Sequence, residues 1–177
     1  MNLSALAHWE SAVLASIAGA TGTIDERDAQ ITRSGLYAEY PTIFGSYLEL
    51  ARDSHDGATA LEALKRSVFL AWWSSNAPPV ETGLAELPES EVRELMAVLE
   101  HAIHTGAVDE ELRLMLAWYR ETFGYPFDHY GPVRPLDEFI GDLSSNDVRE
   151  RGAAGIRRHD RGQLGRYWSQ VLADRGR

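Results

Sequence analysis

Residues 58–76, ATALEALKRSVFLAWWSSN, form the most apolar helical pattern in the chain. Phe69, Leu70 and Trp73 carry apolar surface beyond a single stripe, and the second half of the segment is therefore apolar nearly all round. Such a helix is expected to be buried, because none of its faces prefers water. The stripe itself recurs at helical spacing: Leu61, Leu64, Val68, Ala71 and Trp72.

Helical periodicity recurs on both sides of this segment, whereas no stretch shows the sustained alternation of a strand. The sequence therefore predicts an all-α, single-domain bundle of about six to eight helices around the central apolar helix. Pro41 disfavours helix at Tyr40, so the helix that precedes the central one is expected to begin at Thr42. The other helices are expected at 3–18, 23–33, 88–106, 109–124, 136–143 and 163–173.

Three further features follow from residues that begin or break helices. The Thr23–Glu26 spacing is a capping box, in which each residue satisfies a backbone N–H at the helix start. Residues 77–83, with two prolines and a glycine, and residues 125–135, dense in aromatics, proline and glycine, are expected to be non-helical loops. Ser145 or Asn146 is expected to cap the start of another weak helix, which Gly152 and Gly155 interrupt.

Composition restricts the classes of function. The 177 residues fit one domain (1–177) with an Arg-rich C-terminal segment from about residue 145, and the absence of cysteine excludes disulfides and thiolate metal sites. The start, MNLSALAHWE, lacks a signal-peptide pattern, and no apolar run approaches the roughly 20 residues needed to cross a bilayer. A cytoplasmic protein without membrane association is expected. The net charge of −10 argues against nucleic-acid binding.

The charge is unevenly distributed along the chain. Residues 149–177 contain eight arginines and three acids, which leaves +5 there and −15 in the preceding 148 residues. Arginine is well suited to bidentate contacts with carboxylates. We therefore expect this arginine cluster to pair with the acidic body, in the same subunit or across a dimer. Its members are Arg149, Arg151, Arg157, Arg158, Arg161 and Arg166.

Two charged residues fall on predicted apolar faces. Glu10 lies within the stripe of the 3–18 helix, and Lys65 flanks the stripe of the central helix. A buried carboxylate needs a cation or hydrogen-bond donors, or its pKa rises. Glu10 is thus either half of a structural pair, with Lys65 as one conceivable partner, or a functional acid. A metal site of Glu10 with His101 and His104 lacks a recognisable motif, and we predict neither a metal nor a cofactor.

The candidate ligand-binding residues combine the two central tryptophans with the aromatic segment at 125–135. That segment brings an acid, an imidazole, a phenol and a guanidinium within seven positions. Asp128 could orient His129 as a base, although neighbouring residues rarely point the same way, and such aromatics often only seal a core. The predicted set is Trp72, Trp73, Tyr125, Asp128, His129, Tyr130 and Arg134.

Two functions remain open. The first is a non-enzymatic protein-interaction or regulatory domain that presents an acidic surface to a basic protein partner. A homodimer is also expected, since Leu114 and Trp118 form a second apolar strip on the 109–124 helix, which is either sandwiched in the fold or shared between subunits. The alternative is a small-molecule-binding protein or enzyme with its pocket near the 125–135 loop.

Overall fold

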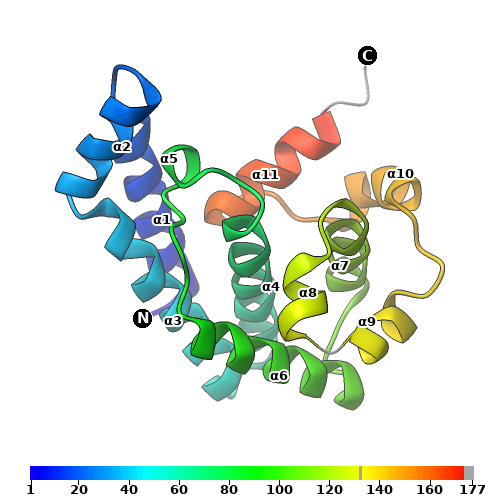
Figure 1. Cartoon of the computed structure of the whole chain (residues 1–177). Helices are drawn as coiled ribbons and strands as arrows, with labels where there is room; N and C mark the ends of the chain where they lie inside the picture. Colours follow the sequence, from blue (N-terminus) through cyan, green and yellow to red (C-terminus); the bar gives the residue numbers. More distant parts are fainter. Residues whose placement is uncertain (132, 174–177) are drawn as a thin grey trace.

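The central helix, α4 (Gly57–Ser74), crosses the middle of the molecule in the computed structural model, and the other helices surround it (Figure 1). The structure describes residues 1–131 and 133–173, apart from the side chain of Val133. Eleven consecutive residues of α4, Glu62–Trp72, are buried. The burial of Val68–Trp72 follows from the apolar pattern of the second half, whereas that pattern does not predict the burial of Glu62 and Arg66 in the first half.

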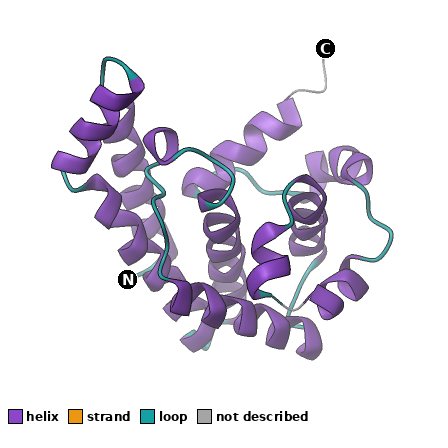
Figure 2. Ribbon diagram, in the orientation of Figure 1, coloured by secondary structure: helices purple, strands orange, loops and turns teal. Residues whose placement is uncertain are grey.

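The described residues form eleven α-helices and one short 3-10 helix, with no strand (Figure 2). The all-α prediction is confirmed, and the unexpected short helices α5 and α8 contribute to a number above the predicted six to eight. Every described helix is too short or too polar to span a bilayer. The remaining elements are α1 (Leu3–Ala18), α2 (Ile24–Arg33), η1 (Leu36–Ala38), α3 (Glu39–Asp53), α5 (Pro79–Thr82), α6 (Glu89–Thr105), α7 (Glu110–Thr122), α8 (Tyr125–Tyr130), α9 (Val133–Ile140), α10 (Ser145–Gly155) and α11 (Gly162–Ala173).

The bundle is arranged in two groups of helices around α4. Helices α1 to α3 lie on one side, and α7 to α9 lie on the other (Figure 1). Helix α3 packs closely along α4, and α11 contacts both α1 and α4. Leu114 and Trp118 on α7 are buried within the same chain, and the Trp118 indole donates to the Tyr167 hydroxyl of α11 at 2.5 Å. Their strip is thus sandwiched in the fold.

Several helix starts follow the predicted capping chemistry. The Thr23–Glu26 capping box is present, with the Thr23 N–H donating to the Glu26 carboxylate at 2.8 Å. Asp109 accepts from the Leu112 N–H at 2.9 Å and starts α7. The N-cap of α10 is Ser144, one residue before the expected Ser145, and Ser144 forms a capping box with Asp147. These contacts satisfy N–H groups that have no partner inside the helix.

Three boundary predictions are wrong, and proline or burial explains each. Helix α3 starts at Glu39, because Pro41 falls in the first turn, where no N–H is needed, and Tyr40 is fully buried. Residues 79–82 form the single-turn helix α5, with Pro79 at its first position. The predicted 125–135 loop contains α8 and the start of α9. Pro132 of that segment and residues 174–177 of the Arg-rich segment lie outside the described residues.

Gly165 on α11 allows the chain before that helix to fold back against it. A Cβ atom at Gly165 would lie 2.0 Å from the Arg158 carbonyl oxygen. Gly165→Ala is therefore expected to lower the free energy of unfolding by about 1 to 3 kcal/mol, through backbone displacement. Gly57→Ala is the matched control, since no atom lies within 4 Å of a Cβ there. Urea unfolding checks both variants; equal effects would contradict this account.

Candidate functional site

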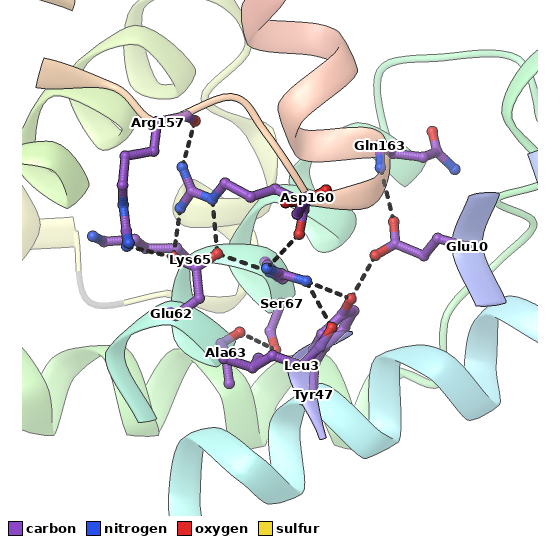
Figure 3. Close-up of polar contacts among 12 residues, drawn as sticks. Leu3, Glu10, Tyr47, Glu62, Ala63, Lys65, Ser67, Arg157, Asp160 and Gln163 are labelled. Atoms are coloured by element: carbon purple, nitrogen blue, oxygen red, sulfur yellow. Dashed lines mark hydrogen bonds and ion pairs between the residues drawn. The ribbon is translucent and has the colours of Figure 1, made fainter. Parts of the chain in front are cut away.

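Charged side chains from α1, α4, α7 and the segment between α10 and α11 meet a tyrosine of α3 beside the buried part of α4, and Figure 3 shows much of this network. At its centre Arg161 forms a bidentate ion pair with Glu62. Its Nε donates to Oε1 at 2.7 Å, and its Nη2 donates to Oε2 at 2.8 Å. Both residues are buried, with exposed fractions of 3% and 7%. Arg157, from the same connecting segment, adds a contact to Glu62 Oε2 at 2.9 Å. This bidentate geometry is the strongest arrangement available to an arginine–carboxylate pair.

Glu111 on α7 extends the network to a second carboxylate. Its Oε1 accepts from Arg161 Nη1 at 2.6 Å and from the Arg157 backbone N–H at 2.8 Å. Its Oε2 accepts from Lys65 Nζ at 2.6 Å, and Lys65 also reaches Asp109 at 2.6 Å. Burial disfavours the charged form of Glu111, but Arg161 and Lys65 outweigh it and hold the pKa of Glu111 below its ordinary value.

Arg66 connects this network to α1 and α3. Its Nε donates to Glu62 at 2.8 Å, and its Nη1 contacts the Tyr47 hydroxyl at 3.2 Å. The same guanidinium donates to the backbone carbonyls of Leu3 and Asp160. Burial lowers the pKa of Arg66, but Tyr47 and Glu62 raise it more, and the net pKa lies above the ordinary value. Arg66 therefore stays charged and ties the 157–161 segment to the central helix.

Glu10 is the last member of this chain of contacts. Tyr47 donates its hydroxyl to Glu10 Oε1 at 2.7 Å, and the Gln163 backbone N–H donates to Oε2 at 3.0 Å. Glu10 thus caps the start of α11 from 153 residues away along the chain. Figure 3 shows Glu10 lying between Tyr47 and Gln163. The approach requires glycine at position 162, where a Cβ would lie 2.5 Å from the Glu10 carboxyl carbon.

Burial is the main influence on the pKa of Glu10. Desolvation raises the pKa of Glu10 from 4.5 to about 7, while the bonds from Tyr47 and Gln163 and the charge of Arg66 oppose that rise. Near neutral pH the side chain therefore exists in both protonation states. Lys65, its conceivable partner from the sequence, instead binds Glu111 and Asp109.

These contacts are typical of a structural network. The buried carboxylates each accept at least two bonds, and their cations contact carboxylates, backbone carbonyls or a hydroxyl. Buried charges that are paired in this way hold their elements in one arrangement, and removal of one partner is costly. Among the described residues, no group of three His, Asp or Glu side chains is placed to hold a metal ion. His104 contacts the Glu100 carbonyl of its own helix.

The predicted ligand-binding residues separate into two groups. Trp72 and Trp73 belong to an aromatic cluster inside the bundle, where Trp72 stacks on Tyr119 at 4.4 Å and Trp73 lies 5.0 Å from Tyr167. The Trp72 indole donates to the Phe123 carbonyl at 3.0 Å. Trp72 is 1% exposed, whereas Trp73 is partly exposed.

The other five predicted residues lie on α8 and α9. His129 stacks on Tyr125 at 5.4 Å and meets Tyr130 edge-on at 4.4 Å. Asp128 pairs with Arg120 of α7 at 2.6 Å and does not contact His129 among the described hydrogen bonds. Arg134 is 89% exposed and pairs with its neighbour Glu138 at 3.0 Å. Asp128 and His129 therefore do not form the expected dyad geometry.

Two cavities contain members of these groups. The tyrosine–glutamate pocket, of about 320 Å³, is lined by Tyr125, Tyr130, Glu86 and Glu89. Its apolar lining comes mainly from the segment between α5 and α6, at Leu84, Ala85 and Leu87. The Trp73–Tyr167 cleft, of about 170 Å³, lies between α1, α4, α5 and α11. Sequence reasoning identified one or two aromatic members of each cavity. It missed the carboxylates, which lie between or at the ends of predicted helices.

Sequence reasoning also missed most of the ion network. Glu62 and Arg66 fall off the apolar stripe of α4, in the half of the helix whose sequence pattern is amphipathic, so the pattern does not indicate their burial. The structure buries both, because the 157–161 segment covers that face. The sequence feature that did point to this network is the excess of arginine at the C-terminal end, which predicted pairing with the acidic body. That pairing occurs within one subunit at Arg151, Arg157 and Arg161.

Comparison of the chain with known protein families, with curated proteins and with solved structures found no match.

Proposed function

We propose that this chain is a non-enzymatic interaction domain that binds a basic protein partner through the tyrosine–glutamate pocket. The supporting observation is the lining of that pocket, which combines two phenol rings with two carboxylates around about 320 Å³. Aromatic faces and carboxylates both attract a lysine or arginine head group, and the apolar walls accept its methylene stem.

The local electrostatics support a cationic occupant. Partial desolvation raises the pKa of Tyr130, and neighbouring Tyr125, Glu89 and Glu86 raise it further. At the rim, the Arg93 guanidinium already lies 5.2 Å from the centre of the Tyr130 ring and pairs with Glu89 at 2.7 Å. Glu86 and Tyr125, which is 49% exposed, remain for an incoming side chain.

The distribution of charge over the whole chain supports the same partner. Arg66, Arg157 and Arg161 direct their charge to internal carboxylates or carbonyls, and Arg149 stacks over Trp118 at 5.2 Å. With a net charge of −10, the remaining surface is expected to attract basic proteins over long distances. Homodimer formation and cytoplasmic residence stay predictions, and Leu114 and Trp118 no longer support the homodimer.

The test is an NMR titration of ¹⁵N-labelled protein with the peptide acetyl-Ala-Arg-Arg-Ala-amide. The matched probe replaces both arginines by citrulline, which has a similar shape but no charge. We expect saturable shifts at Tyr125 and Tyr130 with the arginine peptide only. Glu86→Gln and Tyr125→Leu are each expected to weaken binding roughly threefold, as for exposed charge and cation–π contacts.

Glu49→Gln is the control variant, because Glu49 is exposed, lies outside the pocket and changes the net charge equally. It should leave binding unchanged within about a factor of 1.5. If Glu49→Gln weakens binding as much as Glu86→Gln, attraction is a property of net charge alone and the pocket assignment is wrong. Equal binding of the citrulline peptide would also contradict the proposal.

A further inference from the structure

We infer that the Trp73–Tyr167 cleft is a second binding site, which takes a small zwitterion such as a free amino acid. This site lies apart from the tyrosine–glutamate pocket, and the two share no lining residue. The inference goes beyond the proposed function and does not depend on it.

The cleft offers one charge of each sign. Glu81 of α5 and Arg166 of α11 both line it and are both exposed. Within the part of the chain that the structure describes, neither side chain forms an ion pair or a side-chain hydrogen bond. Among the described arginines of the C-terminal segment, Arg151, Arg157 and Arg161 form ion pairs, whereas Arg158 and Arg166 form none. A carboxylate fits Arg166 and an ammonium fits Glu81.

The aromatic wall of the cleft has an unused donor. Of the five tryptophans, four indole N–H groups donate to named acceptors: Trp9 to Glu39, Trp72 to Phe123, Trp118 to Tyr167 and Trp168 to Tyr119. Trp73 has no such acceptor among the described residues, although it lines the cleft. Trp73 is partly exposed, and its N–H is not a fully buried atom, so it is accessible to water or to the carboxylate of a ligand.

Size and shape restrict the ligand further. A volume of about 170 Å³ is below the usual range for drug-sized ligands, and suits a molecule with about a dozen non-hydrogen atoms. The rings of Trp73 and Tyr167, 5.0 Å apart and inclined by 56°, provide an apolar wall for one side group. Gln170 also lines the cleft. An apolar or aromatic amino acid matches this combination.

The test uses L-phenylalanine and two blocked forms, with the indole N–H signals of ¹⁵N-labelled protein as readout. N-acetyl-L-phenylalanine lacks the ammonium, and L-phenylalaninamide lacks the carboxylate. L-phenylalanine is expected to shift the Trp73 signal most, with a dissociation constant on the order of 1 mM. Each blocked form should bind about tenfold more weakly, as expected for loss of one charged contact. Trp73→Phe assigns the signal.

Variants separate the cleft from a general effect of added solute. Arg166→Gln should abolish the advantage of L-phenylalanine over its amide, and Glu81→Gln its advantage over the acetylated form. Arg158→Gln is the control, since Arg158 is exposed and lies outside the cleft. The inference is overturned if L-phenylalanine causes no saturable shift of Trp73 up to about 20 mM, or if the blocked forms bind equally well. Shifts confined to Tyr125 and Tyr130 would also overturn it, while leaving the proposed function intact.

Discussion

Replacing Arg161 with methionine is expected to lower the free energy of unfolding by about 3 to 5 kcal/mol, the usual result of breaking a buried ion pair. Methionine approximates the length of the arginine stem, so little packing is lost. It leaves Glu62 and Glu111 without the donors that Arg161 supplies to both, and each carboxylate is 7% exposed. Arg66, Arg157 and Lys65 compensate only in part, because they occupy other positions around these oxygens.

Urea unfolding at pH 7.5 measures this loss. Arg158→Met is the matched control and should change stability by no more than about 0.5 kcal/mol, because Arg158 is exposed. Arg161→Lys keeps the charge but cannot form two parallel hydrogen bonds to Glu62. Its loss of stability should fall between those of Arg161→Met and Arg158→Met. A loss below about 1 kcal/mol for Arg161→Met is typical of an exposed ion pair and would contradict the burial of Arg161 with Glu62 and Glu111.

Glu10→Gln is expected to remove most of the pH dependence of stability between about pH 5 and 8. The folded-state pKa of Glu10 is raised to about 7 from 4.5, and the folded protein therefore binds this proton more tightly than the unfolded chain does. The stability from the protonated form is complete below pH 4.5 and is lost as the pH rises through 7. The difference is on the order of 3 kcal/mol.

Glutamine mimics the protonated acid at all pH values. The variant should match the natural protein within about 1 kcal/mol at pH 5, and be more stable by about 2 to 3 kcal/mol at pH 8. Unfolding in urea at four pH values from 5 to 8 checks this. Glu49→Gln, at an exposed carboxylate, should leave the slope unchanged. A Glu10→Gln variant with the original slope would show that another group is responsible.

The architecture was predictable because burial on all sides leaves a clear trace in sequence. The apolar pattern of 58–76 identified the central helix, and capping residues such as Thr23 and Asp109 marked helix starts. The short helices α5 and α8 were not predictable, since each contains proline near its first turn and is too short to show periodicity. There the packing of surrounding helices decides the conformation, and local propensity does not.

The site was predictable only in part, because a helical projection cannot tell which polar face another segment will cover. Glu10 was identified as a buried acid by its place in an apolar stripe, but its partners Tyr47 and Gln163 are 37 and 153 residues away. Glu62 lies off the apolar stripe of α4, and nothing near it in the sequence indicates that Arg161, 99 residues later, covers it. Charge asymmetry predicted that arginines meet acids, without indicating which pairs form.

The most direct test of the internal ion network is the exchange of arginine Nε–H protons in ¹⁵N-labelled protein at pH 7. The network predicts separate, slowly exchanging signals for Arg66 and Arg161, whose Nε–H groups both donate to Glu62. Their exchange should be at least about 100-fold slower than that of Arg134, which is 89% exposed. Exchange of Arg161 as fast as that of Arg134 would contradict the buried network and the account of surface charge derived from it.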